Sequence, residues 1–251
     1  MDETLDAIGG LQIFQRRKGY RFSVDALLLA DFARVDRGPI VDLGTGSGIV
    51  ALALARQTGC PVTAVELQPD LAALARRNAA LNGLGEQVEV IEGDLRGLRS
   101  RLAPGTFECA VSNPPFFEAG AGHVNPASEK ALARHEVAGS IRDVACAARW
   151  LLGPGGRLCV VFPAPRLTAL TDALDSNKLA LARLRCVHSR PDRDAHLVLA
   201  EAIKNAPRTR TTLLAPLFLF DDAGRESDEA KAITARVGAP RSKGQGLPQR
   251  R

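Results

Sequence analysis

Residues 41–48 read Val-Asp-Leu-Gly-Thr-Gly-Ser-Gly, and they are the strongest indication of the fold class. The apolar run Pro39–Leu43 predicts a buried strand, and the pattern from Gly48 to Gln57 predicts a helix. Glycines at every second position lack a β-carbon, so the backbone can turn sharply and a ligand can approach the main chain. The helix start also offers unpaired N–H groups. Together these features predict a site for a flat or anionic ligand.

The spacing of the glycines indicates which class of ligand fits. A nicotinamide-binding fold usually has Gly-x-Gly-x-x-Gly, with the pyrophosphate lying against the helix start. Gly44, Gly46 and Gly48 are spaced one residue more closely than that pattern. This spacing disfavours a dinucleotide and leaves a dehydrogenase as a remote alternative.

Beyond this turn, short apolar runs alternate with helical patterns, which is typical of parallel strands joined by crossover helices. The last two apolar runs, Ala182–Ser189 and Ala195–Ile203, predict a hairpin that places an antiparallel strand on the sheet edge. We therefore predict an α/β protein with a Rossmann-like fold and a seven-stranded, mostly parallel sheet. The other predicted strands are Val62–Val65, Val88–Ile91, Phe107–Val111 and Arg157–Phe162, and the other predicted helices are Ser23–Phe32, Pro69–Leu81, Val137–Leu152 and Ala164–Leu174.

One large domain accounts for most of the 251 residues, of which 45% are hydrophobic. We expect an N-terminal segment over 1–35, the main domain over 36–225 and a disordered basic tail over 226–251. Arg236–Arg251 is rich in Gly, Pro, Gln and Arg, with too few apolar residues to order itself. The net charge of +5 suits a polyanionic partner, although a solvated surface explains most of the arginines equally well.

Simple features disfavour several classes of protein. No stretch approaches the roughly 20 apolar residues of a membrane helix, and the acidic Met1–Ile8 is unlike a signal peptide. We therefore expect a cytoplasmic protein with no membrane partner. The five cysteines never form a Cys-x-x-Cys pair, and the four histidines show no metal-ligand spacing, so we predict no disulfide framework and no metal site. The oligomeric state is left open.

Two acidic residues directly follow predicted strands. Glu66 comes about 20 residues after the glycines, where an acid can accept hydrogen bonds from ribose hydroxyls. Asp94 can accept from an adenine amino group while Leu95 packs on the ring. The alternative for both acids is an ordinary cap at a turn or helix start.

The chemistry is indicated most sharply by Asn113-Pro114-Pro115-Phe116, directly after the fourth strand. An exocyclic amino group or side-chain amide is a poor nucleophile because its lone pair is delocalised. The Asn113 side-chain oxygen and the Pro114 carbonyl can accept its two N–H protons and favour a pyramidal nitrogen. Two prolines stiffen the backbone, and Phe116 can stack on the flat target. These four residues are the predicted catalytic residues.

Asp42–Gly48 together with Asn113–Phe116 resembles the S-adenosylmethionine-dependent amino-methyltransferases of class I. More narrowly, Gly19–Leu29 is similar to a segment of the bacterial tRNA(Val) adenine-N6 methyltransferase family, which modifies the adenine next to the anticodon. The resemblance implies that Gly19–Asp25 closes over the cofactor S-adenosylmethionine. The family often has tyrosine at the position of Phe116, and phenylalanine preserves stacking without the hydroxyl. The implied cofactor residues are Tyr20, Asp25, Asp42, Gly44, Thr45, Gly46, Gly48, Glu66, Leu67, Asp94, Leu95 and Asn113.

The resemblance implies N6-methylation of an adenine in tRNA, with tRNA as the partner. Enzymes that methylate ribosomal RNA or a protein glutamine share the Asn-Pro-Pro-aromatic motif and remain alternatives. A different class is a non-catalytic module that keeps the cofactor pocket to support an RNA-binding surface. A non-catalytic module is disfavoured because the residues of both motifs are intact, namely Gly44, Gly46, Gly48 and Asn113.

Overall fold

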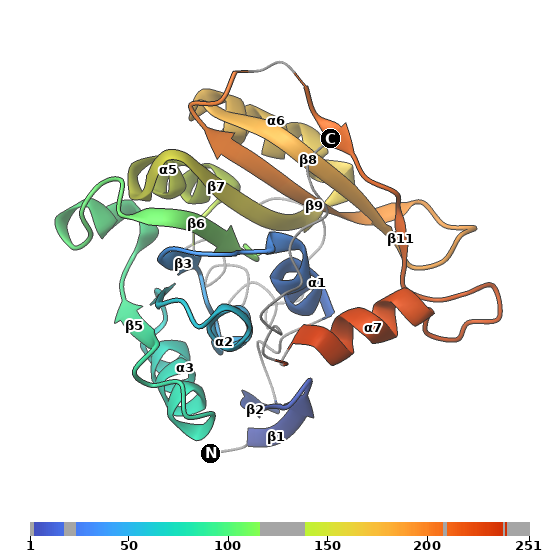
Figure 1. Cartoon of the computed structure of the whole chain (residues 1–251), viewed down its shortest axis with the longest axis horizontal. Helices are drawn as coiled ribbons and strands as arrows, with labels where there is room; N and C mark the ends of the chain where they lie inside the picture. Colours follow the sequence, from blue (N-terminus) through green and yellow to red (C-terminus); the bar gives the residue numbers. More distant parts are fainter. Residues whose placement is uncertain (1–2, 18–23, 116–138, 208–209, 238, 240–251) are drawn as a thin grey trace, which may run out of the picture.

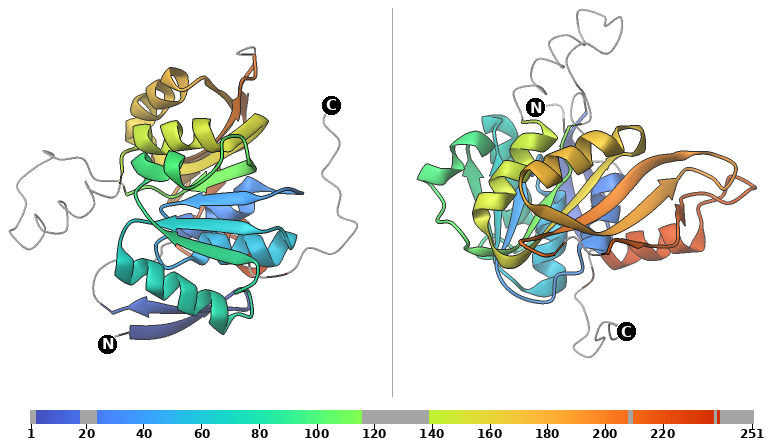
Figure 2. Two further views of the ribbon diagram at one scale, coloured as in Figure 1. Left: turned by 90° about the vertical axis from the view of Figure 1, so that its left-hand side faces the viewer. Right: turned by 90° about the horizontal axis from the view of Figure 1, so that it is seen from above.

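A mixed β-sheet covered by helices on both faces forms the centre of the computed structural model (Figures 1 and 2). The structure describes residues 3–17, 24–115, 139–207, 210–237 and 239. The main sheet has nine strands in the order β10-β8-β9-β7-β6-β3-β4-β5, with β11 also pairing with β8. The sheet confirms the predicted Rossmann-like α/β class.

Five parallel strands position the predicted site and the glycine turn, which we define as Gly44–Gly48. Most of their inner residues are buried because helices cover both faces, so β3, β4 and β6 read as mainly apolar runs, whereas β5 at the sheet edge alternates as Val-Glu-Val. Gly153–Gly156, between the predicted helix Val137–Leu152 and the predicted strand Arg157–Phe162, lies inside the last of them, where the pairing with its neighbour is irregular. The strands are β3 (Ile40–Leu43), β4 (Val62–Glu66), β5 (Val88–Glu92), β6 (Phe107–Ser112) and β7 (Leu152–Pro163).

The helices form two layers, with a separate apolar core under each (Figure 1). Helix α5 begins at Ile141, later than predicted, because Ser140 and Asp143 form a capping box there. One layer contains α1 (Val24–Ala33), α2 (Ile49–Thr58), α3 (Pro69–Leu81) and α7 (Asp228–Val237), and the other contains η1 (Leu95–Ser100), α5 (Ile141–Leu151), η2 (Ala164–Arg166) and α6 (Leu167–Ser176).

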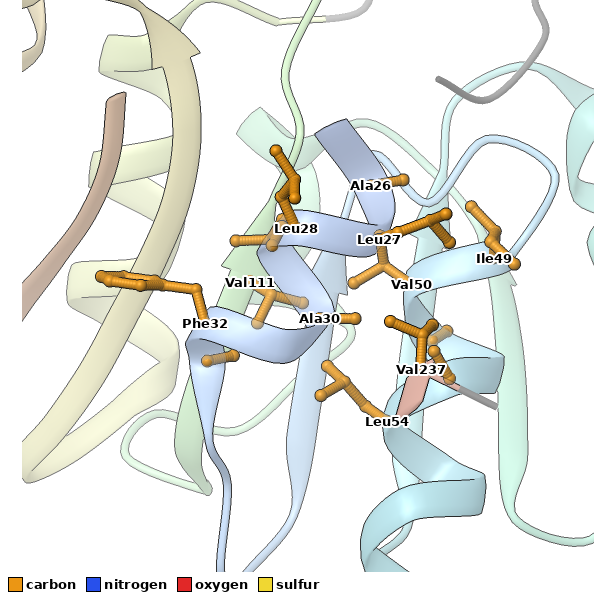
Figure 3. Packing of buried hydrophobic residues seen from close by; sticks show 14 of the residues in the cluster. Ala26, Leu27, Leu28, Ala30, Phe32, Ile49, Val50, Leu54, Val111 and Val237 are labelled. Carbon is orange, nitrogen blue, oxygen red and sulfur yellow. The ribbon is translucent and has the colours of Figure 1, made fainter. Parts of the chain in front are cut away.

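Helix α1 is apolar on nearly every side because it is enclosed on nearly every side. Leu27 and Leu28 lie among side chains of α2 and β6, including Ile49 and Val111, and Val237 of α7 reaches the same cluster (Figure 3). A helix that is buried all round has no reason to show one polar face. This packing fixes the start of α2, and with it the glycine turn.

The predicted C-terminal hairpin is present, but its antiparallel strand is not the edge strand. β9 (Ala195–Lys204) runs antiparallel between β7 and β8 (Leu179–His188). β8 is flanked in turn by two-residue strands, β10 (Thr212–Leu213) and β11 (Leu217–Phe218), which bring the sheet to nine strands. The interior place of β9 explains its buried Glu201, whose carboxylate binds Arg157 of β7 at 2.9 Å and Arg183 of β8 at 2.7 Å.

The two ends of the described chain contain structure that the sequence did not predict. A hairpin of β1 (Glu3–Ile8) and β2 (Leu11–Arg16) packs on α3, outside the main sheet. Helix α7 lies within the expected disordered tail 226–251, so that prediction is wrong for Asp228–Val237, whose Ala230, Ile233 and Val237 are buried. Residues 240–251 lie outside the described part. Of the helices described, none is both long and apolar enough to cross a bilayer.

Candidate cofactor and target site

The carboxyl ends of β3, β4, β5 and β6 bring the predicted motifs to one edge of the sheet. β3 pairs with β4 on one side and with β6 on the other, so the glycine turn lies between Glu66 and Asn113. The buried Ser112 hydroxyl donates to the Leu43 carbonyl at 2.7 Å. This bond joins the residue before Asn113 to the residue before Gly44, and so fixes the two motifs relative to each other.

The backbone N–H groups of Gly44, Thr45, Gly46 and Gly48 in the glycine turn already have hydrogen-bond partners within the chain. The N–H groups of Gly44 and Thr45 both donate to the Val65 carbonyl at 2.9 Å, and that of Gly48 donates to Thr45 at 3.0 Å. The Gly46 N–H donates to the Glu66 carboxylate at 2.9 Å. The unpaired donors that the sequence suggested are therefore already satisfied at these four positions. A pyrophosphate would find few of them available.

Asp42 is a buried residue near the end of β3 that stabilises the turn. Its carboxyl group is buried and accepts from the Thr45 hydroxyl at 2.6 Å. Burial raises the pKa of Asp42 to about 7, while hydrogen bonds from Thr45 and the Ala51 backbone oppose that rise. Asp42 therefore shapes the loop through Thr45 and does not present an open carboxylate to a ligand.

Glu66 lies at the end of β4, where the sequence placed it. It is 4% exposed, and its two oxygens accept from the N–H groups of Gly46 and Gln68, each at 2.9 Å. Burial raises the pKa of this carboxyl group above its usual value, against those two bonds and one from Leu67. These three bonds use three of the roughly four lone-pair sites of the carboxylate, so Glu66 can hold the loop and still accept from one ribose hydroxyl.

S-adenosylmethionine fits these residues better than an anionic ligand does. A β-carbon built on Gly44 would meet no atom within 4 Å, so the main chain there is open to a ligand. The Ser47 hydroxyl is buried and has no partner among the described residues. The neighbouring acids and the internally paired N–H groups favour a cation, and S-adenosylmethionine carries a positive sulfonium. This ligand could be held by the turn and Glu66.

Asp94 has a local partner in the structure. It is the N-cap of η1, and both of its oxygens bind Arg96 of the same turn, which lowers the pKa of the carboxyl group. The capping alternative thus describes what Asp94 does here, and its bond to adenine stays a prediction. Leu95 is buried against α5, and Leu67 is half-buried after β4.

The target motif is only partly within the described residues. Asn113 and Pro115 are half-buried at the end of β6, and Pro114 is buried. Asp25 is half-buried in the first turn of α1. Phe116 and Tyr20, with the rest of the predicted closing segment up to Ser23, lie outside the described part. No group of His, Cys, Asp and Glu in the described ranges could hold a metal ion.

Sequence reasoning missed two polar residues that support the site. Ser112 is buried and donates to Leu43. Asn78 in α3 is fully buried and donates to the carbonyl of Ser47 at 2.9 Å. A signal was present for Asn78, because it lies on the buried face of an amphipathic helix where an apolar residue is expected. Ser112 has no comparable signal in the sequence.

Comparisons with known proteins agree with this geometry. A family described as "Methyltransferase domain" matches residues 40–136. A tRNA1(Val) (adenine(37)-N6)-methyltransferase of Porphyromonas gingivalis is 33% identical over 210 residues, covering 78% of this chain and 82% of that protein. A predicted O-methyltransferase from Agrobacterium tumefaciens has a TM-score of 0.68 at 25% identity, covering 88% of this chain and 99% of that one.

A third comparison is with a geranyl diphosphate C-methyltransferase from Streptomyces coelicolor A3(2), solved with S-adenosyl-L-homocysteine. It shares the fold alone, with a TM-score of 0.51 at 15% identity over 71% of this chain and 77% of that one. The sheet order, the glycine turn and the relative of high coverage agree. The chain is an S-adenosylmethionine-dependent methyltransferase and belongs to the tRNA1(Val) adenine-N6 methyltransferase family.

Proposed function

We propose that this enzyme methylates the exocyclic N6 of an adenine in tRNA, next to the anticodon. The observation that carries the proposal is the place of Asn113, which follows β6 and is tied to the glycine turn by the bond from Ser112 to Leu43. Two acceptor groups beside a methyl donor suit an amino group with two N–H protons. The name of the Porphyromonas gingivalis relative supports adenine in tRNA as the substrate.

The proposed reaction needs acceptors and alignment but no catalytic base. The Asn113 side-chain oxygen and the Pro114 carbonyl accept from the two N–H groups of the adenine amino group. The nitrogen then becomes pyramidal, and its lone pair leaves the conjugated system and faces the methyl donor. When bound, S-adenosylmethionine supplies an electrophilic methyl group on a sulfonium. Transfer of this methyl group would form the N–C bond as the C–S bond breaks, and the nitrogen, then cationic, could release one proton to water without a base. Phe116 is the proposed stacking residue for the base.

The cofactor half of the site contributes shape and charge. We propose that Gly44, Gly46 and Gly48 surround the methionine and ribose, and that Glu66 accepts from the ribose. Leu67, Asp94 and Leu95 are proposed to contact the adenosine. Asp42 and Thr45 then act through the loop that they hold, because their side chains bind each other.

The net charge of +5 supports an RNA partner through attraction to phosphates, and this attraction weakens with added salt. A tRNA substrate would also place the enzyme in the cytoplasm. The proposal is tested by measuring transfer of labelled methyl from S-adenosylmethionine into unmodified total tRNA, with nucleoside analysis of the labelled species. We expect N6-methyladenosine in one tRNA. Label that enters only ribosomal RNA or a protein glutamine would keep the chemistry and overturn the substrate.

A further inference from the structure

Strand β4 and helix α3 together contact three consecutive residues of the glycine turn. Glu66, just before the helix, accepts from the Gly46 N–H, and Asn78 donates to the Ser47 carbonyl. Gly48 lies so close to the helix that a β-carbon there would be 3.3 Å from the Ala75 side chain. The turn therefore rests on the β4–α3 unit at each of its last three residues before α2.

Of these contacts, the one made by Asn78 also reaches the N-terminal hairpin. Its side-chain N–H groups donate to the carbonyls of Ser47 at 2.9 Å and Phe14 at 3.1 Å, and its oxygen accepts from the Phe14 N–H at 2.8 Å. Asn78 is fully buried, so an unpaired partner could not turn to water. One amide thus joins β2, α3 and the cofactor turn.

Asn82 makes the same pattern of bonds one helical turn later. Its oxygen accepts from the Gln12 N–H at 2.9 Å, and its amide nitrogen donates to the Gln12 carbonyl at 2.7 Å. The third bond differs, because Asn82 donates to the backbone of Asn78 and not to the turn. The two asparagines therefore hold alternate residues of β2, as a neighbouring strand would, and only Asn78 continues the connection to the turn.

The ion pairs between the hairpin and α3 are more exposed than the amides. Arg16 binds Asp70 at 2.8 Å, with the Asp70 side chain 80% exposed, and Arg77 binds Glu3 at 2.9 Å. An exposed pair such as Arg16–Asp70 contributes little to stability, whereas Arg77 binds both oxygens of Glu3 and lies over the Phe14 ring. Among the contacts described, the side-chain amides of Asn78 and Asn82 are the groups that bind the backbone of β2 to the helix.

We propose that Asn78 is a positioning residue for S-adenosylmethionine, through which the docking of the β1–β2 hairpin is coupled to the shape of the cofactor turn. When β2 is seated, Asn78 is held with one N–H aimed at Ser47, and the Ser47 carbonyl fixes the turn between Gly46 and Gly48. The coupling is reciprocal, so an occupied cofactor site stabilises the docked hairpin. The proposal concerns cofactor binding only and does not depend on which substrate is methylated.

The test compares Asn78→Ala with Asn82→Ala, using the dissociation constant for S-adenosylmethionine from calorimetry on the full chain. Both variants lose two bonds to the hairpin backbone, but only Asn78→Ala releases the turn. We expect the dissociation constant to rise roughly tenfold for Asn78→Ala and less than about twofold for Asn82→Ala. In the methylation assay, Asn78→Ala should raise KM for the cofactor with little change in kcat, whereas a loss of folded enzyme would lower kcat instead.

Equal changes in the dissociation constant for the two variants, or none for Asn78→Ala, would overturn the proposal. If Asn78→Ala does not fold, Asn78→Ser replaces it, because the shorter hydroxyl cannot bond to both Phe14 and Ser47. A measurement on the unaltered protein gives an independent answer. Added S-adenosylmethionine should slow hydrogen exchange of the Phe14 amide more than that of the Gln12 amide. Equal slowing at both amides contradicts the coupling.

Discussion

The two halves of the site differ in how completely the protein itself holds them. In the cofactor half, the N–H groups of Gly44, Thr45, Gly46 and Gly48 all have partners within the chain, and Glu66 is 4% exposed. In the target half, Asn113 and Pro115 are only half-buried at the end of β6. The first half is preorganised by folding, whereas the second presents acceptors to a molecule that must arrive.

This difference separates binding from chemistry. Changes in the cofactor half should act on the affinity for S-adenosylmethionine, because they disturb a turn that exists before any ligand binds. Changes in the target half should act on turnover, because its acceptors meet their partners only with the substrate present. The Ser112–Leu43 bond is the described contact through which the two effects can mix.

The largest expected effect is that of Asn113→Ala on turnover. Removing one acceptor aimed at the amino group should lower kcat by on the order of 10²–10³-fold, because that acceptor is aligned with the transition state. S-adenosylmethionine should still bind, and any change in its affinity would reflect the cofactor contact that the family resemblance also implies for Asn113. The check is single-turnover methyl transfer together with calorimetry. Asn113→Asp keeps an acceptor and should retain more activity than alanine, and equal activity of the unaltered and alanine enzymes would refute the mechanism.

The next largest effect is that of Glu66→Gln on cofactor affinity. A glutamine amide can accept at one oxygen only, so either Gly46 or Gln68 would face an N–H group and the negative charge would be lost. We expect the dissociation constant for S-adenosylmethionine to rise about 30-fold, which corresponds to about 2 kcal/mol, with kcat at saturating cofactor nearly retained.

Glu92→Gln is the matched control for Glu66→Gln. Glu92 pairs with Glu66 across the β4–β5 ladder and ends its own strand, but it is exposed. Its substitution should leave the affinity within about twofold, since an exposed charge is screened by solvent. Similar losses of affinity in the two variants would show that the negative charge near the site governs binding, and not the hydrogen bonds of Glu66 to the turn.

The features that the sequence could predict are those that depend on local rules. Helix α3 begins and ends at the predicted Pro69 and Leu81, and the glycine turn and Glu66 lie where the pattern placed them. These features rest on local rules, namely a proline at the helix start and a glycine turn between strand and helix. The family resemblance was also confirmed by the relative that the chain covers well.

What was missed depends on contacts between distant segments. The hairpin β1–β2 has a local signal in its Gly9-Gly10 turn, with positive φ at both residues, but its place on α3 depends on bonds to the distant Asn78 and Asn82. The interior place of β9 follows from Glu201 meeting arginines of two strands, which no single segment reveals. Helix α7 was included in the expected tail, whereas its Ala230, Ile233 and Val237 are buried in the core that also contains α1 and α2.

A smaller effect, shared by both halves, is expected from Ser112→Ala. The variant removes a buried hydrogen bond to the Leu43 carbonyl, which should lower the free energy of unfolding by about 1–2 kcal/mol. Because the bond lies between the two motifs, kcat should fall and KM for the cofactor should rise, each by a few-fold. Thr106→Ala, which removes an exposed hydroxyl bonded within its own turn, is the control in urea unfolding and kinetics. A change in only one kinetic constant would assign Ser112 to one half.

The smallest effect is a pH dependence that should belong to the cofactor half alone. Burial raises the pKa of Asp42 to about 7, from a model-peptide value of 3.8. Between these two values the folded chain holds a proton that the unfolded chain has lost, so the contribution of Asp42 to stability declines as the pH rises through this window. Carboxyl groups whose pKa is lowered, such as Asp94 and Asp221, are ionised in both states above about pH 5 and add no slope there.

Asp42→Asn isolates this contribution, since an amide oxygen can still accept from Thr45 but does not titrate. Between about pH 5 and pH 8, the free energy of unfolding in urea should fall more steeply for the unaltered protein than for Asp42→Asn. Asp222→Asn, an exposed substitution, should leave the slope as it is. The rate of the methyl-transfer step at saturating cofactor should show no matching difference, because Asp42 lies behind the turn and touches neither Asn113 nor the substrate. A parallel change in that rate would mean that the turn and the target half move together, and the separation of binding from chemistry would then fail at the loop itself.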